Sequence, residues 1–146
     1  MSQEEMKQVL MEIKGIERQV TQCFEKSTHM SLTRYEMLQQ LYHNGRMVQS
    51  DLRDALKIDQ AAVTRHLKVL EQENLVKRER NADNNREVFV ELSSQGQQRL
   101  SGCSCNRTQF FDELYAGFSE AEFSQLQHFV KRLNQNVINM KEGLTQ

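Results

Sequence analysis

One continuous segment, residues 47–92, constrains the fold of this chain more than any other feature. Apolar residues recur at helical spacing in residues 47–58 and again in residues 60–74. Two short segments of alternating apolar and polar residues follow, 75–80 and 87–92. A helix, a turn, a second helix and a β-hairpin together form a winged helix-turn-helix, whose second helix can enter the major groove of DNA. The segment therefore predicts a DNA-binding regulator.

Capping residues set the expected helix boundaries. Asp59 is expected to be the N-cap of the second helix of this segment, and Asn74 is expected to end it in the left-handed conformation. Upstream, Thr33 is expected to be an N-cap, with Glu36 completing a capping box. Ser119 opens a second capping box and predicts the start of a last helix.

Further amphipathic helices are predicted on both sides of the winged segment. Residues 3–26 carry apolar side chains at steps of three and four, and one continuous helix is expected from residue 93 to about residue 118. The absence of Pro and the small number of Gly, six, favour long helices. The expected inward faces comprise Tyr35, Leu38, Leu41, Tyr42, Leu52, Ala55 and Leu56. The predicted fold class is mainly α, with an α+β element only in the wing hairpin.

A chain of 146 residues suits a single domain. Within it we expect a winged helix-turn-helix lobe at residues 30–92 and a helical region formed by residues 1–29 and 93–146. The terminal helices carry more apolar surface than a small winged module needs. They either pack on the same core in a monomer or interlock with a second copy, and we favour the homodimer. A dimer places two recognition helices about one DNA turn, ~34 Å, apart.

Composition excludes several other classes of protein. No apolar run approaches the ~20 residues of a membrane span, and the first residues lack the cationic and apolar parts of a signal peptide. Three cysteines are too few, and odd in number, for a secreted disulfide framework. A cytoplasmic protein with no membrane partner is therefore expected.

The charge balance supports DNA binding only weakly. The formal net charge is −1, whereas phosphate contacts need Lys and Arg. Residues 46–86 hold nine Lys or Arg against seven acids, an excess of two positive charges. The case therefore depends on where the cations lie.

The second helix of the segment has a polar face suited to a major groove. With Val63, Leu67 and Leu70 directed inward, the opposite face presents Gln60, Ala61, Thr64, Arg65 and Lys68. Gln can pair with adenine, Ala and Thr methyl groups can meet thymine methyl groups, and Arg can bind guanine or phosphate. The alternative is a solvated helix face that happens to be polar, and the hairpin that follows makes this alternative less favoured.

The predicted wing carries three arginines. Arg78 and Arg80 share a face of one strand, and Arg86 leaves the polar tip on the returning strand. Arg86 can enter a minor groove, where the negative potential is strongest if the groove is narrow. It can also pair with Asp83 and brace the hairpin, and the two roles are compatible.

The chain resembles MarR-type transcriptional regulators. The resemblance is carried by residues 63–78 (VTRHLKVLEQENLVKR), 86–96 (REVFVELSSQG) and 32–38 (LTRYEML), and it covers nearly the whole chain. It implies an all-helical dimer with two winged lobes that binds palindromic operators and usually represses transcription. Two positions depart from the family pattern: Asn74 stands where a Gly is usual, and Asn84 stands at the Asp of the wing tip. The second departure leaves open how the wing arginine is held.

The resemblance also implies a signal that releases DNA, and three kinds remain open. A pocket for a small phenolic or lipophilic ligand would be lined by Phe24, Met30, Tyr35, Met37, Phe110, Phe111 and Tyr115, although such residues more often belong to the hydrophobic core. Thiol oxidation would act on Cys23, Cys103 or Cys105, although free cysteines in helices are most often small apolar residues. Metal sensing has the least support, because His29, His43, His66 and His128 lack ligand spacing.

An enzyme is not expected, and no cofactor is implied. The sequence has no Gly-rich phosphate loop, no zinc-protease helix and no nucleophile elbow. The main alternative to a regulator that binds double-stranded DNA is a winged-helix module that binds other proteins and no DNA, which the near-neutral charge would suit.

Overall fold

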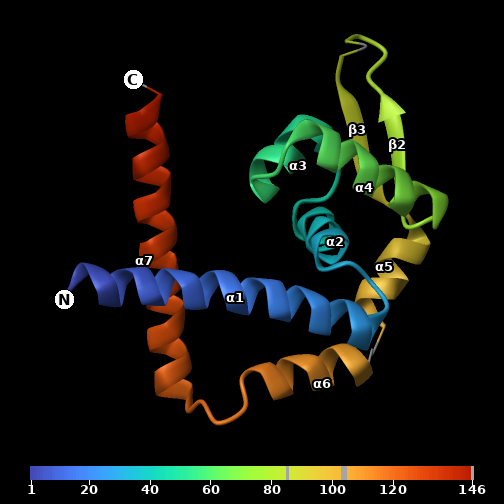
Figure 1. The fold of residues 1–146 in the computed structure, drawn as a ribbon. Helices are drawn as coiled ribbons and strands as arrows, with labels where there is room; N and C mark the ends of the chain where they lie inside the picture. Colours follow the sequence, from blue (N-terminus) through green and yellow to red (C-terminus); the bar gives the residue numbers. More distant parts are fainter. Residues whose placement is uncertain (85, 103–104, 146) are drawn as a thin grey trace. The chain divides into compact units, whose positions relative to one another are not determined.

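A computed structural model of the chain describes residues 1–84, 86–102 and 105–145. The fold is mainly helical, with one small sheet (Figure 1). In chain order the elements are α1 (Gln3–Thr28), α2 (Leu32–Asn44), β1 (Met47–Val48), α3 (Gln49–Leu56), α4 (Gln60–Gln72), β2 (Val76–Arg80), β3 (Val88–Leu92), α5 (Ser94–Ser101), α6 (Cys105–Leu114) and α7 (Glu120–Leu144). The chain forms two compact units, residues 1–108 and 109–146, which are described separately below.

The predicted helix-turn-helix is confirmed, and its boundaries have local causes. Lys57 ends α3 with a left-handed φ of 56°. The Asp59 side chain caps α4 by accepting a hydrogen bond from the Ala62 N–H at 2.7 Å. Asn74, with φ 60°, supplies the left-handed residue after α4, so Asn performs the role for which Gly is the common choice.

The predicted hairpin is also confirmed, and it belongs to a three-stranded antiparallel sheet in the order β1-β3-β2. Figure 1 shows β2 and β3 projecting past α4. The third strand, β1, was not predicted: Met47 and Val48 pair with Val90 and Phe89. Residues 47–58 were expected to be helical throughout, but the first two of them extend along β3 before α3 begins.

The core of the first unit lies between α2, α3, α4, α5 and the inner face of the sheet. Its fully buried side chains include Leu38, Leu52, Leu67 and Val90, each 0 % exposed. Two expected core positions are wrong. Tyr42 is 52 % exposed, and Ala55 is also exposed; the buried residues of α3 are Gln49, Leu52 and Leu56.

Two predicted helix boundaries are also wrong. The N-cap of α2 is Ser31, whose Oγ accepts from the Arg34 N–H at 3.4 Å, and not Thr33. The helix expected from residue 93 to about 118 is two helices, α5 and α6. Arg107 stabilises the end of α5, because its Nη2 donates to the carbonyl oxygens of Leu100 at 2.8 Å and Gly102 at 3.2 Å.

The junction between β2 and α5 is tightly packed. Ser93 donates its N–H to the Leu75 carbonyl at 3.0 Å, and its Oγ accepts from the Gly96 N–H at 3.0 Å. A Cβ atom added at Gly96 would overlap the Leu75 carbonyl oxygen and lie 3.1 Å from Leu92 Cδ2. Only glycine therefore allows α5 to approach the start of β2 this closely.

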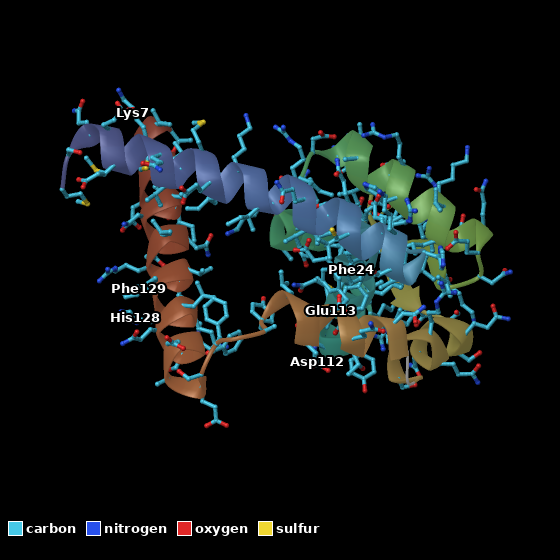
Figure 2. The ribbon with its side chains drawn as sticks, turned by 60° about the horizontal axis from the view of Figure 1, so that its bottom comes forward. Lys7, Phe24, Asp112, Glu113, His128 and Phe129 are labelled. Carbon is cyan, nitrogen blue, oxygen red and sulfur yellow. The ribbon has the colours of Figure 1, made fainter. Side chains whose placement is uncertain are left out.

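The second unit contains most of α6 and all of α7. The Ser119 capping box predicted from the sequence is present: Glu122 Oε2 accepts a hydrogen bond from the Ser119 N–H at 2.8 Å. Tyr115 and Phe123 stack edge to face, with ring centroids 4.9 Å apart. Most of the large apolar side chains along α7, among them Phe129 (Figure 2), are exposed, and none of the described residues of this helix is buried.

Candidate DNA interface

The two faces of α4 are divided as the sequence predicts. Val63, Leu67 and Leu70 are 0 % exposed and belong to the core. The opposite side is exposed at each predicted position: Gln60, Ala61, Thr64, Arg65 and Lys68. The division is confirmed as geometry, whereas contact of these five residues with DNA remains a prediction.

Thr64 is held by Gln49, a residue that was not predicted from the sequence. Gln49 is only 8 % exposed, and its Nε2 donates a hydrogen bond to Thr64 Oγ1 at 3.2 Å. The Thr64 hydroxyl in turn donates to the Gln60 carbonyl at 3.0 Å. Both bonds lie inside the helix-turn-helix, so the methyl group is the part of Thr64 best suited to meet a thymine methyl.

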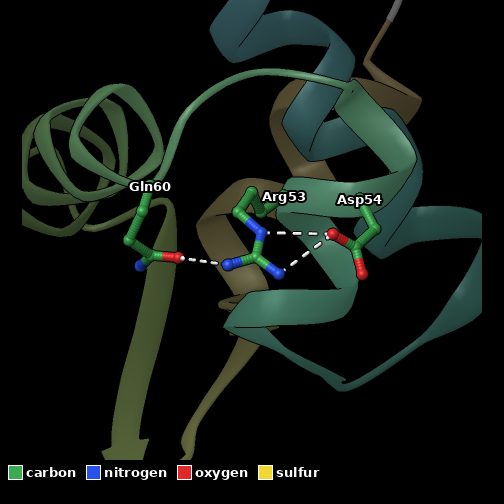
Figure 3. A network of polar contacts seen from close by, with 3 residues as sticks. All are labelled: Arg53, Asp54 and Gln60. Atoms are coloured by element: carbon green, nitrogen blue, oxygen red, sulfur yellow. Dashed lines mark hydrogen bonds and ion pairs between the residues drawn. The ribbon is translucent and has the colours of Figure 1, made fainter. Parts of the chain in front are cut away.

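Gln60 also has a partner on α3. Arg53 donates from Nη1 to Gln60 Oε1 at 3.4 Å, and from Nε and Nη2 to Asp54 Oδ1 at 3.1 Å each (Figure 3). Gln60, which is predicted to contact a base from the start of α4, is therefore linked to the preceding helix. From the sequence, Arg53 was only one of the nine cations of the segment.

Arg78 lies where β2 meets α4. Its Nε and Nη2 donate to the two carboxylate oxygens of Glu71 at 3.2 and 3.1 Å, and its side chain is 22 % exposed. This hydrogen-bonded pair lowers the pKa of the Glu71 carboxyl. The contact braces the wing against the recognition helix, and a DNA contact by Arg78 remains a prediction.

The wing tip is built by asparagine side chains. Asn84 Oδ1 accepts from the Arg86 N–H at 3.1 Å, and Asn81 Oδ1 accepts from the Asp83 N–H at 3.0 Å. Asn84, which stands at the Asp position of the family pattern, thus accepts a hydrogen bond within the wing turn. Arg86 is exposed, and no ion pair with Asp83 occurs among the residues that the structure describes. Arg80, the last residue of β2, is exposed as well, and its contact with DNA remains a prediction.

The outer face of the sheet has its own aromatic and charged contacts. The Arg46 guanidinium lies 4.2 Å from the centre of the Phe89 ring and 3.3 Å from Glu79 Oε2. Lys77 and Glu91 join these residues around a hollow of about 240 Å³. Because only the C-cap residue Gly45 separates Arg46 from α2, this contact attaches the wing near the end of that helix.

The ion pairs leave the excess of two positive charges in residues 46–86 unchanged but show which of the charges are paired. Three acids, Asp54, Glu71 and Glu79, are bound to Arg53, Arg78 and Arg46. Within the described ranges, three residues predicted to contact DNA, Arg65, Lys68 and Arg86, form no ion pair. The outward cations of α4 and the wing tip therefore keep their charge for phosphate or base contacts.

His66, on α4, has a lowered pKa. Its pKa is lowered from 6.5 by partial burial, and further by the positive charges of Arg34 and Arg65. Arg34, on the first turn of α2, was not identified as part of this surface by sequence. A phosphate near this group would oppose that shift, because a negative charge favours the protonated imidazole.

Comparison with known proteins decides the family. The MarR family model matches residues 30–88. The HTH-type transcriptional regulator YdgJ of Bacillus subtilis is 35 % identical over 134 residues, which cover 92 % of this chain and 82 % of the relative. The chain belongs to the MarR family. It is a DNA-binding winged helix-turn-helix transcriptional regulator, and the MarR family is not a family of enzymes.

Solved MarR-type structures share the fold. A mutant of MarR from E. coli, complexed with operator DNA, matches with a TM-score of 0.78 and 19 % identity, over 88 % of this chain and 95 % of that one. BpsR of Bordetella bronchiseptica matches with a TM-score of 0.78 and 18 % identity, over 87 % of this chain and 98 % of that one. The fold prediction, including the long terminal helices, is confirmed.

The predicted ligand-pocket residues of this MarR-family chain fall into two groups. In the first unit, Phe24 stacks on Tyr35 with ring centroids 5.1 Å apart, Met30 and Tyr35 pack against the core, and Met37 is fully buried in it. Phe110, Phe111 and Tyr115 lie in the second unit, with the first two rings 5.4 Å apart. A ligand pocket formed by these residues remains a prediction.

The predicted redox residues can be placed only in part. Cys23 is an exposed free thiol on α1. Cys103 and the side chain of Cys105 lie outside the described residues. No three His, Cys, Asp or Glu side chains in the described parts of the chain are grouped as metal ligands. None of the described helices is both long enough and apolar enough to span a membrane.

Proposed function

We propose that this MarR-family chain is a dimeric repressor that acts in the cytoplasm and binds palindromic operators. In each protomer, α4 enters a major groove and the wing contacts the flanking DNA. The observation that carries the proposal is the outward face of α4, where Arg65 and Lys68 are exposed and, among the described residues, form no ion pair. Release by a small ligand or by thiol oxidation is part of the proposal.

The apolar stripes of the terminal helices support the dimer. On α1 the stripe consists of Met6, Val9, Leu10, Ile13 and Ile16, with exposed fractions from 44 % to 58 %. On α7 it consists of Phe129, Val130, Leu133, Val137 and Met140, with exposed fractions from 48 % to 66 %. Contiguous apolar surface along two helices of 26 and 25 residues marks a protein-contact surface. A second copy of the chain is the partner that presents the same stripes.

The solved neighbours support binding and release. The E. coli MarR mutant was captured with operator DNA, and the DNA binding of BpsR is regulated by 6-hydroxynicotinic acid. A small aromatic acid is close in chemistry to the phenolic effector that we expect here. Oxidation remains the second route, and the exposed thiol of Cys23 is the described residue best placed for it.

The test is selection of binding sites from a random duplex pool at near-physiological salt, with the protein reduced. We expect an enriched palindrome whose half-sites lie about one helical turn, ~34 Å, apart. Titration of that site should show log K falling with log salt at a slope near −0.9 per phosphate contacted. A reduced and dimeric protein that enriches no site would instead support the protein-interaction module, which the near-neutral charge of the chain suits.

A second assay separates the two routes of release. The complex with the selected site is challenged in parallel with small aromatic acids and with a mild thiol oxidant. Release by the acids alone supports the ligand route, whereas release by the oxidant alone, reversed by a reductant and absent in Cys23→Ser, supports thiol oxidation at Cys23. Resistance to both would contradict this part of the proposal.

A further inference from the structure

Two side-chain hydrogen bonds join α3 to α4, Gln49 to Thr64 and Arg53 to Gln60, and the second involves a charged residue. This residue joins an acid beside it, Asp54, to Gln60, the first residue of the recognition helix (Figure 3). We propose that Arg53 is a positioning residue for base recognition: it holds the Gln60 amide in one orientation, in which Gln60 selects adenine. The inference rests on the proposed function, because it requires α4 to lie in a major groove.

The orientation of the amide follows from donor and acceptor chemistry. An arginine side chain has five N–H donors and no acceptor. The Gln60 atom that faces Arg53 Nη1 at 3.4 Å is therefore the oxygen, and the Nε2 amino group is the other end of the amide. A flipped amide would place N–H groups against a guanidinium that cannot accept them, so the Arg53 contact disfavours the flip.

This orientation leaves the two groups that an adenine edge needs. An amide oxygen has two lone pairs, so Gln60 Oε1 can accept from Arg53 and from the adenine N6 amino group together. Gln60 Nε2 can at the same time donate to adenine N7, which completes the bidentate Gln–adenine pattern. A guanine presents two acceptors, O6 and N7, on the same edge and cannot supply the donor. Gln60 held in this way should distinguish the two purines.

Arg53 is itself fixed in place. Asp54 Oδ1 accepts from both Nε and Nη2 at 3.1 Å, which sets the plane of the guanidinium. Three of its five N–H groups are then used, and one hydrogen on Nη1 and one on Nη2 remain. The side chain is 38 % exposed, so these two hydrogens are accessible to a DNA phosphate. The first helix of a helix-turn-helix crosses the DNA backbone, so one residue would connect phosphate docking to base reading.

The competing explanation is a surface ion pair without a role in recognition. The Asp54 side chain is 68 % exposed, and exposed pairs contribute little to stability. Substitutions at Arg53 should therefore leave the fold intact, which allows recognition to be measured by itself. The Lys variant is the informative one, because Lys retains the positive charge but lacks the planar fork that reaches Asp54 and Gln60 together.

The experiment compares the full-length wild type with Arg53→Ala, Arg53→Lys, Gln60→Ala and the double variant Arg53→Ala/Gln60→Ala. Arg99→Ala is the control, since it removes one exposed arginine from α5. Each protein first selects sites from the random pool. Its affinity is then measured on the wild-type site and on sites with one base pair changed, at fixed salt. Thermal unfolding of each variant checks the fold.

We expect one adenine position at which Arg53→Ala, Arg53→Lys and Gln60→Ala each lose about tenfold in discrimination, the scale of one bidentate base contact. In the Gln60→Ala background, Arg53→Ala should cause no further loss of discrimination, because Arg53 acts through Gln60. Arg99→Ala should discriminate like the wild type.

Two results overturn the inference in distinguishable ways. If Arg53→Lys discriminates like the wild type, or if the two Ala substitutions act additively, Arg53 contributes charge alone and the proposed function stands. If the wild-type chain enriches no site, the proposed function fails, and the positioning role fails with it.

Discussion

Replacing Gly96 with Ala tests the close approach of α5 to the Leu75 backbone. Helix propensity alone predicts a gain of about 1 kcal/mol, because Gly96 lies in the first turn of α5. The structure predicts the opposite sign, since the new Cβ would overlap the Leu75 carbonyl oxygen and crowd Leu92 Cδ2 at 3.1 Å. Overpacking against backbone costs about 3 kcal/mol, at the upper end of the usual range, because a carbonyl cannot rotate away as a side chain can.

The net expectation is a loss of about 2 kcal/mol, the overpacking cost less the propensity gain. For a chain of 146 residues this lowers the melting temperature by about 4–8 °C. Thermal unfolding followed by circular dichroism at a fixed protein concentration measures it. Gly15→Ala is the matched control: it makes the same change within a helix, outside the apolar stripe of α1, where a Cβ meets nothing within 4 Å. The control should be slightly stabilised. A Gly96→Ala protein as stable as the wild type would refute the close approach of α5 to Leu75.

Four further predictions concern recognition, assembly and pH. Arg65→Ala should weaken binding to the selected site by roughly 1–3 kcal/mol and relax specificity at one position, as measured by titration, and unchanged affinity would remove Arg65 from the base contacts. Arg86→Ala should weaken binding with little change in base preference, and a loss confined to one base step would contradict a role at phosphate or in a narrow groove. Leu133→Glu, in the exposed stripe of α7, should shift sedimentation from dimer to monomer, while Gln135→Glu on the opposite face should leave the dimer intact. The pKa of His66 is lowered from 6.5 in the folded chain, so its contribution to stability is complete above about pH 6.5 and is lost as pH falls through the lowered pKa. Urea unfolding at several pH values should therefore show a smaller loss of folding free energy at low pH in His66→Gln than in the wild type. Equal losses in the two proteins would contradict this role of His66.

The local signals in the sequence were sufficient for most of the fold. Asp59 and Asn74 act at the ends of α4 through bonds or dihedral angles within a few residues, so a single-sequence pattern could identify them. The strand β1 could not be found in this way. Its two residues exist as a strand only because Val90 and Phe89, more than forty positions later, pair with them. The break between α5 and α6 is similar, because Arg107 supplies the closing bonds from beyond the helix end.

The candidate interface shows a second limit of the same kind. The spacing of α4 predicted which side chains face outward, and the exposed fractions agree. It did not predict Gln49 behind Thr64 or Arg53 beside Gln60, because each contact joins α3 to α4 and depends on the angle between the two helices. A periodicity within one helix contains no information about that angle. The residues that orient a base-contacting side chain are therefore harder to predict than the base-contacting residue itself.

The charge count along the sequence and the placement of charges in the fold lead to different conclusions about DNA binding. Counted along residues 46–86, the cations exceed the acids by only two, a poor argument for binding a polyanion. The fold places Glu71 and Glu79 against Arg78 and Arg46, where the pairs attach the wing to α4 and to the end of α2. Each such pair contributes no net charge to the field at the DNA, while Arg65 lies on the outward face. The relevant quantity is therefore the charge left on the groove-facing side after pairing, and an almost neutral lobe can still present a cationic surface to DNA.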